Sequence, residues 1–350
     1  MNVTIEKYGV LKNGKDVDLI SLITEKLVVQ VINYGSRMVS ICTPNKKREM
    51  ENILLNYRSL SEYENDKVYL GCVLGRCANR IKNSEFEIQE KKYKLPKTEG
   101  KHHLHGGKIG FDKKLWDYQI VKGKDSLGVK LTYVSVAGEE GYPGNLSCTA
   151  DYTINNKNEL LVQLNASSDS ITPINLSIHP YFNLTGSTSY NILSHKFKLN
   201  APKILEVDSE GILTGEIIDV SNTEMDLTSL ATIEKKVKSI YPNIKNRGGF
   251  DHSYLFDDKS MKNEQIEVID DYSGRIMKMQ SSAPLIHFYS GNYLPLGYQE
   301  GIIYRFKKYA GFALEPQFFS KINGTLLPFI LLNPDQKFEC KNKFSFECIK

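Results

Sequence analysis

Short runs of alternating apolar and polar residues recur along this 350-residue chain and predict an all-β protein. Successive side chains of a strand point to opposite faces of a sheet, so a strand with one buried face alternates in this way. Tyrosine (20) and phenylalanine (15) far outnumber tryptophan (1), as suits the half-buried surface of a pleated sheet. These observations favour an all-β fold with few helices.

Two isolated strands and two hairpins carry this prediction. Residues 27–33 are mostly aliphatic and β-branched, and residues 129–134 alternate between apolar and polar side chains. A hairpin is expected where two such runs are separated by a few polar, turn-forming residues. The first hairpin joins 86–89 to 93–95 with its turn at 89–92, and the second joins 148–154 to 159–165 with its turn at 155–158.

One segment has the spacing of a helix. In residues 229–240, the apolar side chains Leu230, Ile233, Val237 and Ile240 fall at i, i+3, i+7 and i+10, which predicts a helix. The chain shows no repeat of 20–50 residues, which disfavours a propeller or a solenoid. Its composition does not change along its length, so we expect a single domain over residues 1–350.

Composition and charge exclude several classes of function. The 45 Lys and Arg residues are scattered and nearly balanced by 41 Asp and Glu, unlike the concentrated positive charge of a nucleic-acid binder. The sequence shows no apolar run of about 18–20 residues, so no membrane span is expected. The first residues lack an apolar leader, and the six cysteines form no Cys-x-x-Cys pair. We therefore expect reduced thiols and a cytoplasmic protein. A monomer or a homodimer is expected.

A histidine and a glutamate lie in segments that otherwise read as buried strands. His179 is embedded in the apolar run 175–184, and Glu315 is embedded in the run 311–317. Titratable side chains are seldom buried without a partner. Two such groups on rigid strands form a candidate acid–base pair. Asn-x-Ser/Thr triplets at Asn175 and Asn183 flank His179, where a glycan would block the site, which again favours a cytoplasmic protein.

Other polar groups stand in glycine-rich or aromatic surroundings. Asn79 and Arg80 follow a glycine-rich stretch, and their planar donors suit sugar hydroxyls or a carboxylate, although a structural arginine is an equal alternative. His105 precedes two glycines, which allow close approach of a ligand to the backbone. The nearby histidines lack the spacing of a zinc site, so no metal is expected. Asp251 could cap a turn or accept hydrogen bonds from vicinal hydroxyls, and His287 begins a segment, 287–292, in which a strand ends in a Gly-Asn turn.

Five segments of the chain resemble motifs of the aldose 1-epimerases, also called galactose mutarotases. They occur in the order of that family and cover nearly the whole chain. They are GRCANRI (75–81), LHGGKIGFDKKLW (104–116), PINLSIHPYFNLTG (173–186), GFDH (249–252) and LEPQ (314–317). The resemblance implies a large antiparallel β-sandwich of the galactose mutarotase type with few short helices. It also implies a protein that interconverts the anomers of hexoses such as galactose and glucose without a cofactor.

By position, the resemblance implies Glu315 as the general base and His179 as the general acid. The residues that it implies as contacts of a small-molecule aldose sugar are Asn79, Arg80, His105, Tyr181 and Asp251. Two departures affect specificity. His287 stands where the family often has Gln, and the Pro-Asp that usually follows the LExQ motif is missing, although Asn323 is kept. A hexose-6-phosphate 1-epimerase and a catalytically silent sugar-binding regulator remain as alternatives.

Overall fold

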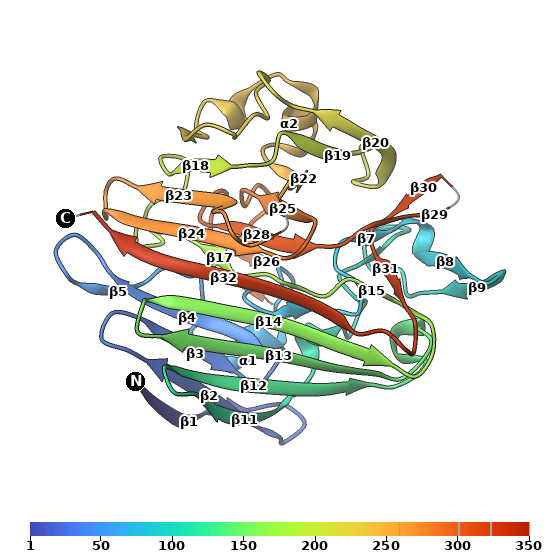
Figure 1. The fold of residues 1–350 in the computed structure, drawn as a ribbon, viewed down its shortest axis with the longest axis horizontal. Coiled ribbons are helices and arrows are strands. Elements are labelled where there is room, and N and C mark those ends of the chain that lie inside the picture. The colour runs from blue at the N-terminus through green and yellow to red at the C-terminus, as the bar shows by residue number, and fades with distance from the viewer. Residues whose placement is uncertain (259, 300–301, 323, 350) are drawn as a thin grey trace.

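The protein is described by a computed structural model that covers residues 1–258, 260–299, 302–322 and 324–349, so Asn323 lies outside the described residues. Within these ranges the strands form three larger antiparallel sheets and several two-stranded ones, which confirms the all-β prediction. The nine-stranded sheet runs across the front of Figure 1, with the other two larger sheets behind it. The core therefore lies between layers of sheet, as in a sandwich.

The nine-stranded sheet has the order β11 (Asp117–Lys122), β12 (Ser126–Ser135), β13 (Leu146–Asn155), β14 (Glu159–Ser168), β32 (Phe338–Cys348), β24 (Arg275–Ser281), β23 (Ile266–Asp270), β18 (Lys196–Leu199), β21 (Ala231–Thr232). The six-stranded sheet has the order β17 (Tyr181–Phe182), β28 (Phe312–Gln317), β25 (Leu285–Tyr289), β22 (Asp251–Leu255), β19 (Lys203–Val207), β20 (Leu213–Asp219). The five-stranded sheet has the order β1 (Asn2–Val10), β2 (Asp16–Ile23), β3 (Val28–Ile32), β4 (Arg37–Pro44), β5 (Met50–Asn52).

The smaller elements connect these sheets. The two-stranded pairs are β6 (Val73–Leu74) with β16 (Ser177–Ile178), β7 (Arg80–Ile81) with β10 (His103–Leu104), β8 (Glu85–Ile88) with β9 (Lys91–Lys94), β15 (Thr172–Ile174) with β31 (Ile330–Leu332), β26 (Leu296–Gln299) with β27 (Ile302–Arg305), and β29 (Ser320–Ile322) with β30 (Thr325–Leu327). The short α-helices are α1 (Leu60–Glu64) and α2 (Pro242–Arg247). Short 3-10 helices lie at Lys82–Ser84, Phe111–Lys113, Glu139–Gly141 and Lys236–Lys238.

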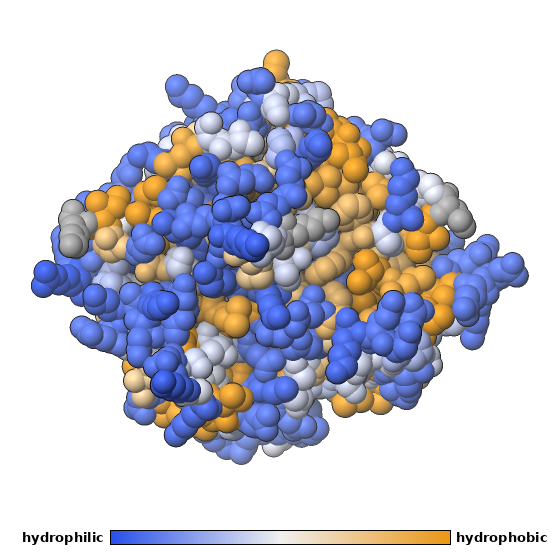
Figure 2. Space-filling view, in the orientation of Figure 1, coloured by the Kyte–Doolittle hydropathy of each residue, from blue (hydrophilic) through white to orange (hydrophobic). Residues whose placement is uncertain are grey.

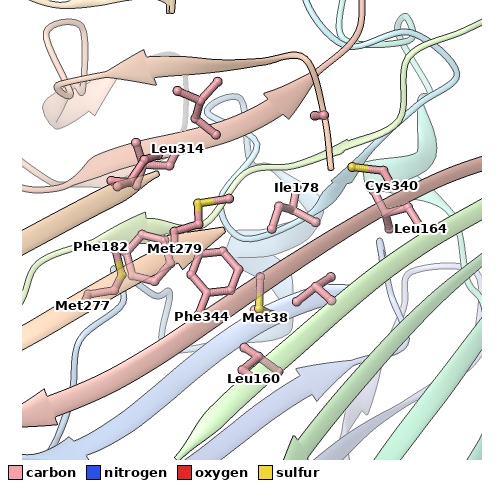
Figure 3. Close-up of a cluster of buried hydrophobic side chains, with 14 of the residues drawn as sticks. Met38, Leu160, Leu164, Ile178, Phe182, Met277, Met279, Leu314, Cys340 and Phe344 are labelled. Carbon is pink, nitrogen blue, oxygen red and sulfur yellow. The ribbon is translucent and has the colours of Figure 1, made fainter. Parts of the chain in front are cut away.

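The core is filled from both layers of the sandwich. Leu160 of β14, Phe344 of β32 and Met279 of β24 meet Leu314 of β28 and Phe182 of β17 in one buried cluster (Figure 3). Each such apolar side chain contributes about 1.5–3 kcal/mol when it is fully buried. The outward face shown in Figure 2 is largely hydrophilic, with apolar residues in smaller groups between the polar ones. Alternation along the strands thus produces the sandwich.

The predicted strands and hairpins are confirmed. Residues 27–33 contain β3, and 129–134 lie within β12. The first hairpin is the antiparallel pair β8 and β9, whose turn at Gln89 and Glu90 has positive φ at both residues. The second is the pair β13 and β14, which turns after Asn155 as expected.

The helix predicted over residues 229–240 is wrong. That segment contains strand β21, which pairs with β18 at the edge of the nine-stranded sheet, and the 3-10 turn Lys236–Lys238. Ile233 is fully buried, but Leu230 is 39% exposed and Ile240 is 87% exposed. The four apolar residues with helical spacing therefore do not form one buried face. Pairing of β21 with the sheet overrides the local helix propensity of the segment.

The cysteines and the asparagines of the triplets near His179 can be placed in the fold. All six cysteines are free. Asn175 and Asn183 are buried, and the Asn175 side chain hydrogen-bonds to the backbone of Phe318 and Pro328, which leaves no room for a glycan. Over the described parts of the chain, no helix is long and apolar enough to cross a bilayer.

Two buried histidines should make folding stability sensitive to mild acid. Burial lowers the pKa of His195 to about 4 and that of His252 to about 3. One ring nitrogen of each accepts a backbone N–H, from Leu184 and Asp251 respectively, so both rings are neutral in the fold. In the unfolded chain their pKa is about 6.5, so the unfolded state binds protons first as the pH falls.

The stabilising effect is therefore complete above about pH 7.5 and is lost as the pH falls through 6.5 toward the folded pKa values. We expect the free energy of unfolding to drop by on the order of 2 kcal/mol per histidine between about pH 7.5 and about pH 5. Urea unfolding at the two pH values measures this drop. A His252→Asn variant, whose amide oxygen can accept the same N–H, should show a smaller drop, and an unchanged pH dependence would contradict the assignment.

Candidate active site

One face of the six-stranded sheet carries a row of polar side chains. In the antiparallel register, His287 of β25 lies opposite Glu315 of β28 on one side and opposite Ser253 of β22 on the other. Residues two positions apart in a strand share a face, so Asp251 and Gln317 belong to the same row. The alternate residues, such as Phe288 and Leu314, point into the core. The same alternation that fills the core therefore presents the polar groups on the opposite face.

A second wall comes from the short strands β7 and β10. Arg80 of β7 pairs with Leu104 of β10, which brings Asn79 and His105 side by side at the ends of these strands. The His105 backbone N–H donates to the Asn79 carbonyl oxygen (3.2 Å). Asn79 (φ 67°) and His105 (φ 50°) both adopt left-handed backbone conformations. Such conformations are uncommon outside glycine and concentrate at functional sites, where the surrounding structure enforces them.

These two walls enclose a cavity of about 190 Å³. It is smaller than the ~300–1,000 Å³ sites that hold drug-sized ligands, and so suits a small molecule. Larger hollows exist, such as one of about 620 Å³ beside Lys236, but that hollow lacks a comparable group of buried titratable residues. All eight residues predicted for the site line the small cavity: Asn79, Arg80, His105, His179, Tyr181, Asp251, His287 and Glu315.

The predicted acid–base pair is in direct contact. His179 Nε2 lies 3.3 Å from Glu315 Oε1, and both side chains are at most 5% exposed. The run 175–184 is not one continuous strand, because it breaks at His179 and Pro180 between β16 and β17. Proline cannot donate to a sheet ladder, which explains the break. The imidazole is held by the ring of Tyr181 (centroids 4.8 Å apart) and by the stacked ring of Tyr69 (6.2 Å).

His105 is a neutral hydrogen-bond donor toward the cavity. Burial and the neighbouring charges of His179 and Arg80 hold its pKa well below the usual value. Its Nδ1 accepts the backbone N–H of Asn79 (3.1 Å). In a neutral ring the proton must then lie on Nε2, which can donate to a ligand oxygen.

This tautomer also bears on metal binding. Ligand atoms of His105, His179 and Glu315 lie within 4.8 Å of one another, close enough to suggest a metal site. A metal-bound histidine normally donates its second N–H to an acceptor. Since His105 Nδ1 already accepts an N–H from Asn79, its Nε2 has no free lone pair for a metal. The donor chemistry of the cluster thus disfavours a metal.

Asp251 is held from two sides. Its Oδ2 accepts from Arg247 Nε (3.0 Å) and Nη2, and its Oδ1 lies 2.9 Å from His287 Nε2. Burial alone would raise the pKa of Asp251, but the His287 hydrogen bond and the charges of His287, Arg247 and Arg80 outweigh it and hold the pKa far below its usual range. The carboxylate is therefore ionised and fixed in orientation.

Three further predicted residues also have hydrogen-bond partners within the protein. Both ring nitrogens of His287 have partners, Asp251 and Ser253 Oγ (3.0 Å). The Tyr181 hydroxyl donates to the Val68 carbonyl oxygen (3.1 Å). The Arg80 guanidinium forms two hydrogen bonds with the Glu99 carboxylate (2.5 and 2.9 Å).

Several cavity residues were not singled out from the sequence. They are Lys67, Val68, Tyr69, Leu104, Tyr289 and Tyr293. Tyr289 lies two positions after His287 and could have been found from the period of two along that strand. The sequence pattern around Tyr69 offers no such signal, since this residue is brought to the cavity by a loop with a left-handed backbone (φ 58°).

Comparison with known proteins identifies the family of this chain. The family described as aldose 1-epimerase matches residues 18–345. The galactose mutarotase of Sus scrofa is 34% identical over 350 residues, 99% of each chain. The aldose 1-epimerase of Escherichia coli (strain K12) is 31% identical over 269 residues, covering 77% of this chain and 76% of that protein. The crystal structure of galactose 1-epimerase from Lactobacillus acidophilus NCFM has a TM-score of 0.87 at 27% identity, covering 100% of this chain and 99% of that one. This chain belongs to the aldose 1-epimerase family.

Proposed function

We propose that this protein interconverts the α and β anomers of a hexose such as galactose or glucose by acid–base ring opening. The observation that carries the proposal is the buried contact between His179 and Glu315 at a small cavity lined by hydrogen-bonding groups. Opening a pyranose ring requires one proton to leave the anomeric hydroxyl and another to reach the ring oxygen. A paired acid and base on rigid elements can perform both transfers.

In the proposed reaction, Glu315 takes the proton of the anomeric hydroxyl and His179 donates a proton to the ring oxygen. The electron pair of the O–H bond forms the C1=O double bond, and the pair of the C1–O5 bond goes to the ring oxygen. Rotation about C1–C2 then exposes the other face of the aldehyde. Ring closure returns both protons, so each group ends in its initial state. Each such group typically supplies about 10²–10⁴-fold in rate.

The remaining groups would orient the sugar. His105 would donate from Nε2, and Asn79, Arg80 and the ionised Asp251 would bind hydroxyls. The ring nitrogens of His287 are bonded within the protein, so His287 would act on the sugar through Asp251. The hydroxyl of Tyr181 is bonded to the Val68 carbonyl oxygen, so Tyr181 would support the ring of His179. Groups held before the substrate arrives lower the entropic cost of reaching a reactive geometry.

The charge pairing of the cavity favours a neutral sugar over a phosphorylated one. A phosphate group is normally bound by arginines that are free to form paired hydrogen bonds with it. Here Arg80 is bonded to Glu99 and Arg247 to Asp251, and the cavity also holds Glu315. A silent regulator is disfavoured by the intact His179–Glu315 contact. We further propose a reducing compartment such as the cytoplasm, given the six free thiols.

Polarimetry tests the proposed reaction. The decay of optical rotation of fresh α-D-galactose and α-D-glucose should be faster with the protein than in buffer, and the ratio of the two rates ranks the sugars. Galactose 6-phosphate should react more slowly than galactose. Faster reaction of the phosphate would favour the phosphorylated substrate, and no acceleration of any sugar by folded protein would favour a binding role.

An Asp251→Asn variant should bind the sugar more weakly. It loses the charge that accepts hydrogen bonds from hydroxyls, and a hydrogen bond to a charged group is worth about 1.5–3 kcal/mol, so KM should rise by roughly 10- to 100-fold. Steady-state polarimetry with galactose gives KM. Asp270→Asn is the matched control, because Asp270 is also buried beside a histidine, His195, but lies outside the cavity. Similar KM values in both variants would contradict the role of Asp251.

A further inference from the structure

Two side-chain hydrogen bonds in series hold the second oxygen of Glu315. The Asn79 Nδ2 donates to Gln317 Oε1 (3.1 Å), and the Gln317 Nε2 donates to Glu315 Oε2 (3.0 Å). The first oxygen, Oε1, faces His179. Asn79 and Gln317 are separated by 238 residues in the chain, so this series connects the two walls of the cavity.

The direction of each hydrogen bond in the series is determined by chemistry. The Asn79 Oδ1 accepts the backbone N–H of Arg80 (2.8 Å), so its NH₂ group faces Gln317. The Gln317 carbonyl oxygen must accept that hydrogen bond, which turns its own NH₂ group toward the carboxylate of Glu315. A carboxylate only accepts hydrogen bonds, so the series has one consistent arrangement. If the Gln317 amide were inverted, its NH₂ group would face the NH₂ group of Asn79 and its oxygen would face the carboxylate of Glu315.

The backbone reinforces this arrangement. Glu315 and Gln317 are two positions apart on β28 and therefore share a face. The intervening Pro316 has a fixed φ and no N–H, and it lies opposite Ile286 in the sheet register. Both side chains are 2% exposed, so water does not compete effectively for the hydrogen bond between them.

We propose that Gln317 is a positioning residue that donates to the carboxylate form of Glu315 and so directs its other oxygen, Oε1, at His179 and the substrate, with Asn79 setting the orientation of the Gln317 amide. This inference rests on the proposed function of Glu315 as general base. A buried carboxylate is costly unless it accepts hydrogen bonds, and a donor to the charged form favours that form. Gln317 is not expected to touch the sugar, since it does not line the cavity as Asn79 and Glu315 do.

Substitution of Gln317 tests the proposal. Gln317→Leu removes the donor with little change in volume, so kcat should fall by about 10- to 100-fold while KM stays within about twofold. The acid limb of the kcat against pH profile should move to higher pH by about one unit, because Glu315 loses a donor to its charged form. Gln317→Glu places a second carboxylate beside Glu315, so it should move the acid limb further in the same direction.

A readout without turnover separates this inference from the proposed function. The side-chain carboxyl carbon of Glu315, labelled with ¹³C and assigned by its loss in Glu315→Gln, can be titrated by NMR in the sugar-free protein. Its pKa should rise in Gln317→Leu relative to the wild type. If the wild type does not catalyse mutarotation, the proposed function fails, but this titration still decides whether Gln317 acts on Glu315.

The matched control is Gln280→Leu. Gln280 is also buried and donates its side-chain amide to a backbone carbonyl, that of Met261, but it lies on β24, outside the cavity. The inference is overturned if Gln317→Leu lowers thermal stability as Gln280→Leu does but leaves both the acid limb of the kcat profile and the titration of Glu315 as they are in the wild type. Should Gln317→Leu fail to fold, the same measurements are made on Gln317→Glu. If the titration of Glu315 in Gln317→Glu is the same as in the wild type, the positioning role is refuted.

Discussion

A Glu315→Gln variant should remain folded and lose about 10²–10⁴-fold in turnover for anomer interconversion. The amide has the size of the carboxylate, so packing beneath the cavity is preserved and its oxygen can still accept from Gln317. It cannot take a proton from the anomeric hydroxyl, which removes the proposed base. Because Glu315 is 2% exposed, removal of its charge should not lower the free energy of unfolding greatly, since burial of a charge is itself costly. Polarimetry with galactose and urea unfolding measure the two effects.

Glu139→Gln is the matched control for this loss. Glu139 is partly buried and accepts hydrogen bonds from Tyr133 and Lys114, but it does not line the cavity. Its substitution should leave turnover near the wild-type value. Wild-type turnover in Glu315→Gln would remove Glu315 from the mechanism.

A His179→Gln variant should lose turnover by a similar factor, about 10²–10⁴-fold, with a smaller change in KM. Glutamine can hydrogen-bond to Glu315 but cannot deliver a proton to the ring oxygen. The aromatic contacts of the imidazole with Tyr181 and Tyr69 are lost as well, so some loss of stability is also expected. The kcat and KM values from polarimetry separate loss of the acid from loss of sugar binding.

The double variant gives a sharper result. If His179 and Glu315 act as one unit, the variant with both substitutions should be little slower than the slower single variant, because neither transfer is useful alone. Multiplicative losses would indicate that the two groups act independently. His252→Asn is the control, since His252 is a buried histidine that follows Asp251 but belongs to the core face of β22.

Local patterns were sufficient for much of the fold. The hairpin β13–β14 and the strands β3 and β12 follow from alternation and turn residues that lie next to each other in the chain. The segment 229–240 shows where this reasoning fails. Its apolar spacing fits a helix, but pairing of β21 with β18 involves residues more than thirty positions away. No local pattern contains that information.

The sequence by itself determined the all-β class and the residue types that could perform acid–base chemistry on a sugar. The motifs around His179 and Glu315 also imply the family without any geometry. Whether they meet depends on the fold, since His179 lies at a break between two short strands and Glu315 lies on the buried six-residue strand β28.

Only the tertiary structure decided how the groups of the cavity are used. The tautomer of His105 depends on the Asn79 amide, the partners of His287 are Asp251 and Ser253, and the orientation of Gln317 depends on Asn79. Each of these is a hydrogen bond between segments distant in the chain. Such bonds form only when sheet register and burial bring their partners within about 3 Å, so their directions cannot be read from residue types alone.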